Sequence, residues 1–83
     1  MNHLDLIAQI IGKLKEIGET KLAEEVSDAQ SSASTGGELI VMVASKLLEI
    51  KEKYPKAYFP IEREVKDLIV FANSIGLYPI WRQ

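Results

Sequence analysis

Few side chains in this chain could carry out chemistry, and the histidine is the first to consider. The 83 residues contain one histidine, His3, and no cysteine. A metal site needs several nitrogen, sulfur or oxygen ligands, and His3 has no second histidine and no cysteine to act with it. The lack of cysteine also excludes disulfides. We therefore expect neither a metal site nor a cofactor.

Paired carboxylates are the second candidate for catalytic chemistry. Glu24 with Asp28, and Glu49 with Glu52, are spaced so that each pair shares one side of a helix. General acid–base catalysis needs a carboxylate in a cleft with a shifted pKa, whereas both pairs fall on polar helix faces. The Glu-x-x-His motif of di-metal helical bundles is absent. The sequence carries no catalytic signature, and we expect a protein that is not an enzyme.

Phosphate and nucleic-acid binding are disfavoured as well. Gly36 and Gly37 precede an apolar run, but the chain has no G-x-x-x-x-G-K phosphate loop. A helix that reads DNA presents polar and basic side chains to the groove, whereas residues 39–43 read Leu-Ile-Val-Met-Val. The formal net charge is -2, and acidic surfaces repel a phosphate backbone. We expect no nucleic-acid partner.

The acidic residues gather in one part of the chain. Residues 19–38 hold five acids, and Lys21 is the only base among them. Such a segment is either a solvated helix face or a docking surface for a basic protein. The five acids are Glu19, Glu24, Glu25, Asp28 and Glu38.

The elements that must position these side chains are predicted to be helices. Apolar residues recur at helical spacing in four segments, and strand alternation is absent. The predicted helices cover residues 2–17, 20–30, 35–54 and 60–75. The predicted apolar face of the first helix contains Leu4, Ile7, Ile11 and Leu14, and Ala8 and Ile10 widen it. With short connections, sequential helices pack as roughly antiparallel neighbours. We therefore predict an all-α fold, a compact four-helix bundle that forms a single domain over residues 1–83.

Several residues mark the ends of these helices. Gly18 suits the left-handed conformation that follows a helix. Thr35 with Glu38 matches the capping box, in which both side chains accept backbone N–H groups at the helix start. Pro55 is predicted to stop the third helix, and Pro60 to stand in the first turn of the fourth.

Aromatic residues cluster between the third and fourth helices and in the C-terminal tail. Tyr54 and Phe59 are predicted to cover one end of the core. The roles of Tyr58, Tyr78 and Trp81 stay open between core and binding surface. The apolar tail, residues 77–83, is expected to fold back in part onto the bundle.

Membrane insertion is not expected from the sequence. No apolar stretch approaches the roughly 20 residues that span a bilayer. The first residues do not resemble a secretory signal, because no basic region precedes an apolar stretch. We expect a soluble, cytoplasmic protein.

The middle of the chain is similar to a known pattern. An acidic segment, LAEEVSDA at residues 22–29, leads through STGGE at residues 34–38 into the apolar run LIVMV. A proline-started helix, PIERE, follows at residues 60–64. Over residues 4–75 this arrangement resembles small all-helical immunity proteins, which are encoded beside the toxins of bacterial polymorphic and contact-dependent growth-inhibition systems.

The resemblance implies a function by binding. An immunity protein neutralises its cognate toxin, and a toxic nuclease is usually basic because it grips phosphates. An acidic inhibitor can associate with such a toxin quickly through electrostatic steering. Replacing Glu24, Glu25 and Asp28 by lysine is then expected to abolish protection of the cell against the toxin without unfolding the protein. The expected contact residues are Glu19, Glu24, Glu25, Asp28 and Glu38, with Tyr58 as an anchor.

Two other functions stay open. A homo-oligomeric structural module is favoured by apolar residues outside the predicted core faces, namely Val41, Met42, Val70 and Phe71. An adaptor that binds an amphipathic helix in a groove is the second alternative. Sedimentation at several concentrations separates the first from the immunity function, and a helical ligand found without a toxin favours the second.

Overall fold

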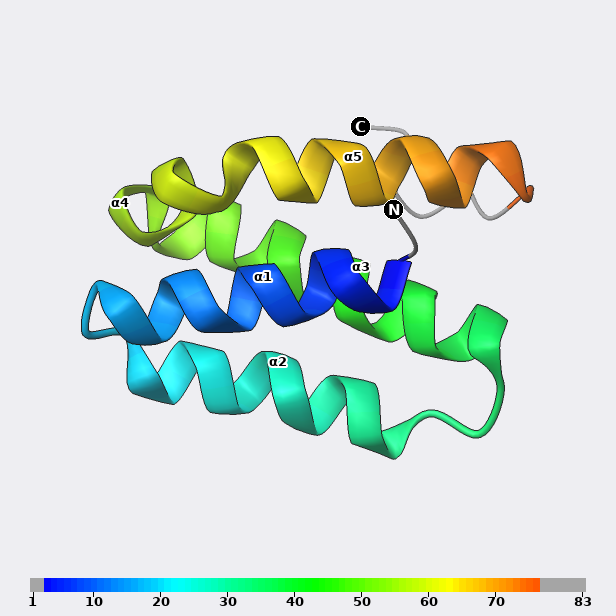
Figure 1. Ribbon diagram of the computed structural model, residues 1–83, viewed down its shortest axis with the longest axis horizontal. Coiled ribbons are helices and arrows are strands. Elements are labelled where there is room, and N and C mark those ends of the chain that lie inside the picture. Colours follow the sequence, from blue (N-terminus) through cyan, green and yellow to red (C-terminus); the bar gives the residue numbers. More distant parts are fainter. Residues whose placement is uncertain (1–2, 77–83) are drawn as a thin grey trace.

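The computed structural model describes residues 3–76 and shows a bundle of four long helices (Figure 1). The four are α1 (His3–Glu16), α2 (Thr20–Ser32), α3 (Gly36–Lys53) and α5 (Glu62–Ser74). Two short elements, α4 (Pro55–Tyr58) and the 3-10 helix η1 (Phe59–Ile61), connect α3 to α5. The described residues contain no strand. The prediction of an all-α four-helix bundle is confirmed.

Consecutive long helices run antiparallel in this bundle (Figure 1). Helix α1 packs against α2 and α5, and α3 packs against the same two helices from the other side. Each long helix therefore has two principal neighbours. The two turns that join α1 to α2 and α2 to α3 are short, which makes each helix fold back along the one before it.

Gly18 ends α1 as the sequence predicts. Its φ is +85°, in the left-handed region that favours glycine. The N–H of Gly18 donates to the carbonyl of Lys15 at 3.1 Å, and the N–H of Glu19 donates to that of Leu14 at 2.8 Å. These two bonds form a Schellman motif, which satisfies carbonyls that the helix end leaves free.

The start of α3 also follows its predicted signal. Thr35 is the N-cap residue, and its Oγ1 accepts the N–H of Glu38 at 3.1 Å. The Glu38 carboxylate accepts the N–H of Ser34 at 2.9 Å. In a standard capping box this second bond comes from the cap residue itself, so the observed arrangement differs by one residue.

The connection to the last helix differs from the prediction. Helix α3 ends at Lys53, and Pro55 then begins α4, since its fixed φ suits the first turn of a helix. Pro60 lies in η1, so α5 begins at Glu62. This extra turn buries Ala57 and Tyr58.

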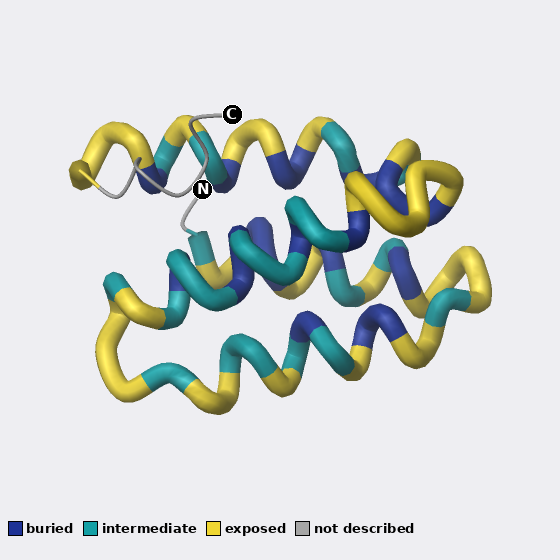
Figure 2. Tube along the Cα trace, turned by 180° about the vertical axis from the view of Figure 1, so that it is seen from behind, coloured by how far each residue is buried: buried dark blue, intermediate teal, exposed yellow. Residues whose placement is uncertain are grey.

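The core lies between the four long helices, where the buried residues face one another (Figure 2). In α1 the buried face is rotated about the helix axis relative to the predicted face, so that Leu6 is buried in place of Leu4. Leu6 is 6% exposed, whereas Leu4 is 47% exposed. Because α1 packs against two helices, the face between them is the one that becomes buried. The fully buried residues of that face are Ile7, Ile10 and Leu14.

The prediction that Tyr54 and Phe59 cover the core is wrong. Tyr54 is 50% exposed and Phe59 is 78% exposed. The single turn of α4 instead turns Tyr58 inward, where it joins the core cluster. The predicted folding back of the tail, with Tyr78 and Trp81, lies outside the described residues.

Candidate protein-binding surface

Two of the predicted contact residues, Glu24 and Asp28, lie on the outer face of α2. Both are exposed, and they stand one helical turn apart. Leu22 and Val26 are buried on the opposite side of the helix. Neither carboxylate forms an ion pair among residues 3–76. Two unpaired negative charges therefore face solvent in the middle of this helix.

Glu25 faces α3 instead. Its Oε1 lies 3.2 Å from the ammonium of Lys46, which also lies 2.6 Å from Oε1 of Glu49. Oε2 of Glu49 is 3.3 Å from Lys53. Hydrogen bonding to Glu49 raises the pKa of Lys46 despite partial burial, and hydrogen bonds from Lys46 and Lys53 lower the pKa of Glu49. Glu25 thus belongs to an α2–α3 network in which each carboxylate has a cationic partner.

Glu19 and Glu38 lie away from the middle of α2. Glu19 is the N-cap residue of α2, and its side chain makes no capping hydrogen bond. Glu38 lies in the first turn of α3, where its carboxylate takes part in the cap. Since α2 has 13 residues and rises about 1.5 Å per residue, these two acids lie at opposite ends of it. The five acids are therefore spread along α2 as far as the start of α3, and we call them the acidic strip. Glu24 and Asp28 point outward in its middle, whereas Glu25 faces α3.

Tyr58 is not placed as a surface anchor. It is 5% exposed and belongs to the hydrophobic core. Burial raises the pKa of its hydroxyl, and the negative charge of Glu62 adds to that rise. The ammonium of Lys51 lies 5.7 Å from the centre of the ring, a cation–π distance. In this conformation Tyr58 offers very little surface to a partner, and we leave it out of the interface below.

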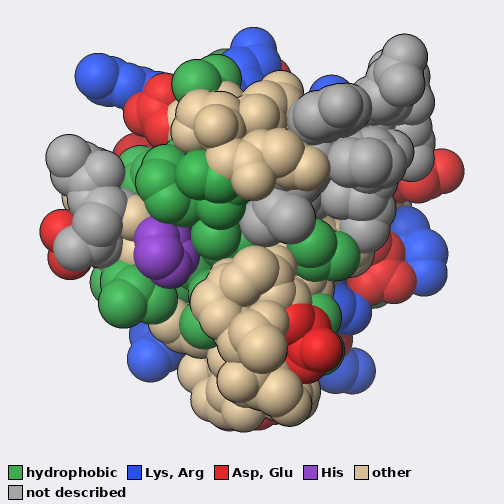
Figure 3. All heavy atoms as spheres, turned by 90° about the vertical axis from the view of Figure 1, so that its right-hand side faces the viewer, with side chains coloured by type: hydrophobic (Ala, Val, Ile, Leu, Met, Phe, Trp, Pro, Cys, Tyr) green, Lys and Arg blue, Asp and Glu red, His purple; other side chains and the backbone are tan. Residues whose placement is uncertain are grey.

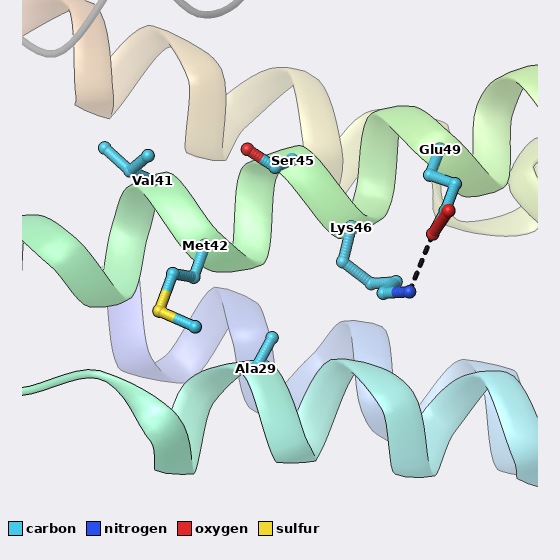
Figure 4. Close-up of a pocket in the computed structure, with 6 residues that line it drawn as sticks. All are labelled: Ala29, Val41, Met42, Ser45, Lys46 and Glu49. Atoms are coloured by element: carbon cyan, nitrogen blue, oxygen red, sulfur yellow. Dashed lines mark hydrogen bonds and ion pairs between the residues drawn. The ribbon is translucent and has the colours of Figure 1, made fainter.

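A groove between α2 and α3 is the feature of this surface that the sequence interpretation missed. Its volume is about 440 Å³. In Figure 4 the side chain of Met42 extends from α3 toward Ala29 of α2. The sequence did mark Val41 and Met42 as surplus apolar residues, and both are half-buried. The groove is lined by Ala29, Val41, Met42, Ser45, Lys46 and Glu49.

A second groove, of about 450 Å³, lies along α5 near the start of α1. The ring of His3 stacks on that of Phe71, with centroids 5.1 Å apart. Figure 3 shows hydrophobic side chains gathered around the histidine at this end of the bundle. The groove is lined by Leu6, Asp67, Val70, Phe71 and Ser74.

Neither a metal site nor a membrane span is found among residues 3–76. No group of three or more His, Cys, Asp or Glu side chains there could hold a metal ion. None of the helices in this range combines the length and the apolar character needed to cross a membrane.

Comparison with protein families, with curated proteins and with solved structures finds no match to this chain. The resemblance to immunity proteins therefore stays a prediction, and function has to be argued from the surface itself.

Proposed function

We propose that this protein is an immunity-type inhibitor that acts in the bacterial cytoplasm by binding a cognate toxin, a basic nuclease, through the acidic strip on α2. The observation that supports this most is the outer face of α2, where Glu24 and Asp28 are exposed and have no ion-pair partner among the described residues. Acidic charge concentrated in one segment attracts basic partners. Helix α2 leaves two carboxylates available to a partner.

Electrostatics makes such a surface useful to an inhibitor. Complementary charge raises the rate of association and disfavours wrong partners. A nuclease that binds a phosphate backbone presents lysine and arginine side chains. An acidic protein bound over that surface competes directly with the nucleic acid.

Exposure and pairing decide which acids we propose as toxin contacts. Glu24 and Asp28 are exposed and unpaired, and Glu19 extends the strip at one end. Glu25 and Glu38 also hold the fold, through Lys46 and through the α3 cap. Reversing their charges would perturb folding, so a clean test is restricted to Glu24 and Asp28.

The test measures binding to the cognate toxin that this proposal expects, sought among the products of genes neighbouring this one. The variant is Glu24→Lys/Asp28→Lys, and the control is Glu52→Lys/Asp67→Lys, which changes the net charge equally at exposed acids on α3 and α5. We expect the first variant to bind at least about tenfold more weakly at low salt and the control to bind like the wild type. Equal weakening in both variants, or none, would contradict the proposed surface.

A homo-oligomeric module remains the second candidate function. Val70 is 66% exposed and Phe59 is 78% exposed, so apolar surface is available for self-association. Sedimentation over a wide concentration range tests this candidate. A protein that stays monomeric throughout contradicts it.

A further inference from the structure

The groove along α5, which we call the α1–α5 groove, lies at the end of the bundle where α5 stops. Its volume is about 450 Å³, and its apolar lining comes from Leu6 of α1 and from Val70 and Phe71 of α5. Val70 is 66% exposed, so most of an apolar side chain faces solvent there. Apolar surface gathered in one place on a small protein marks a site where another apolar group binds.

The end of α5 turns the chain back toward this groove. Gly76 has a φ of +86°, and its N–H donates to the carbonyl of Asn73 at 3.1 Å. A left-handed glycine with the equivalent bond also ends α1 at Gly18, as part of a Schellman motif. In that motif the residue after the glycine often makes an apolar contact with a residue of the last helical turn. The corresponding positions at the end of α5 are Leu77 and Phe71.

The segment that follows Gly76 has the composition and the length that the groove requires. Residues 77–83 read Leu-Tyr-Pro-Ile-Trp-Arg-Gln, so the first five of them carry no charge. These seven residues reach up to about 23 Å when extended, whereas Ser74 and Asp67 are only about 10 Å apart along the axis of α5. A segment that starts shortly after Ser74 can therefore return over the whole groove.

We propose that the occupant of the α1–α5 groove is residues 77–81 of the same chain. The segment lies back along α5, with Leu77 on Phe71 and with Trp81 one to two turns further back, beside Leu6. Contact removes apolar surface of both the segment and the groove from water, which is the main favourable contribution to such an association. Because the segment is tethered beside the groove, its effective concentration there is high.

One charge complements this direction of the segment. Asp67 lines the groove, is exposed and has no ion-pair partner among residues 3–76. Arg82 is the only charged side chain of residues 77–83 and follows Trp81 directly, which brings it within reach of that carboxylate. An exposed ion pair adds little to stability, so this contact favours one direction of the segment while the apolar contacts hold it.

A second copy of the chain is disfavoured as the occupant. Two separate molecules lose translational and rotational freedom when they associate, and a segment of the same chain avoids that cost. Among the described residues, only those of α1 and α5 line the groove, so the acidic strip on α2 stays open when the segment is bound. Loss of the segment should therefore leave binding of the toxin unchanged.

The first experiment uses the fluorescence of Trp81, the only tryptophan of the chain. In the folded protein we expect emission at shorter wavelength than in concentrated urea, together with protection from quenching by iodide. Val70→Gln changes the groove and Leu77→Gln changes the segment, and each should shift the emission toward the wavelength measured in urea. The matched control Phe59→Gln removes an exposed apolar side chain before the start of α5 and should leave the emission unchanged.

Circular dichroism and sedimentation accompany these measurements, so that loss of helix or self-association is recognised. An emission from the wild type that already matches the value in urea overturns the proposal. An emission that neither Val70→Gln nor Leu77→Gln shifts, in variants that keep their helix, overturns it as well. Emission that changes with protein concentration identifies a second copy as the occupant and also contradicts the proposal.

The second experiment locates the segment by nuclear Overhauser effects in the isotope-labelled full chain. We expect cross-peaks from the indole of Trp81 to the methyl groups of Leu6 and Val70, and from the methyl groups of Leu77 to the ring of Phe71. Cross-peaks from the indole to residues of α2 or α3 alone would place the segment elsewhere and overturn the groove as its site. Absence of cross-peaks between residues 77–81 and both α1 and α5 overturns it too.

Discussion

The ammonium of Lys13 lies 2.6 Å from Oε2 of Glu64, an ion pair that ties α1 to α5 across 51 residues of chain. Glu64 is 6% exposed, and its second oxygen, Oε1, is buried with no hydrogen-bond partner among the described residues. Burial acts to raise the pKa of this carboxyl. The hydrogen bond from Lys13 and the backbone N–H of Glu64 outweigh that effect, so the pKa is lowered below 4.5.

Lys13→Met should destabilise the protein because it leaves a buried carboxylate without its cation. We expect a loss of about 1–3 kcal/mol in the free energy of unfolding at neutral pH. The double variant Lys13→Met/Glu64→Met should recover part of this loss, since it removes the unpaired charge as well. Urea unfolding measures both values. A double variant less stable than Lys13→Met would contradict this account of the pair.

The same ion pair predicts a dependence of stability on pH. The pKa of Glu64 is lower in the folded protein than its ordinary value of 4.5, so the unfolded state binds the proton more tightly. The stabilisation is therefore complete above that value and is lost as the pH falls through the lowered folded pKa. Unfolding midpoints of wild type and Glu64→Gln, compared at about pH 7 and about pH 3, should differ most at the higher pH. A constant difference would show that the ion pair contributes nothing.

Two glycines of similar exposure should respond to alanine in opposite ways. Gly18 has a φ of +85°, and Gly12 lies inside α1, with no atom within 4 Å of an added Cβ at either position. Gly18→Ala should cost about 1 kcal/mol, because alanine is strained in that conformation. Gly12→Ala should stabilise by about 0.5–1 kcal/mol, since alanine favours the helix. Thermal unfolding of the two variants checks the signs, and equal effects would contradict the assigned end of α1.

Leu6 and Leu4 provide a test of how α1 is turned. Leu6 is 6% exposed and Leu4 is 47% exposed. Leu6→Ala should lower the free energy of unfolding by about 2–3 kcal/mol, and Leu4→Ala by less than about 1 kcal/mol. Chemical denaturation gives both numbers. A larger loss for Leu4→Ala than for Leu6→Ala would contradict the observed orientation of α1 and support the face predicted from the sequence.

Features that depend on a few adjacent residues could be predicted from the sequence. The end of α1 at Gly18 and the start of α3 at Thr35 depend on the conformation of glycine and on a hydroxyl within reach of the next turn. The four-helix arrangement followed from apolar spacing and short connections. These residue patterns can be read without knowing which residues far along the chain pack against them.

Features decided by packing could not be predicted in the same way. The apolar arc of α1 is wide, and only its contacts with α2 and α5 decide that Leu6 is buried and Leu4 is not. The sequence did not predict the turn of α4, and it is this turn that places Tyr58 in the core. Glu64 is buried because Lys13 reaches it from another helix. Of the candidate surface, the exposed acids of α2 could be predicted, whereas the groove needed the relative position of α2 and α3.

The most direct test of the central claim is survival of bacteria that produce the cognate toxin that the proposal expects, sought among the products of neighbouring genes. Each culture also produces the wild type, Glu24→Lys/Asp28→Lys or the control Glu52→Lys/Asp67→Lys, all checked for equal amount and folding. The account predicts that the wild type and the control protect the cells and that Glu24→Lys/Asp28→Lys does not. Equal survival with all three proteins, or no protection by the wild type, would contradict it.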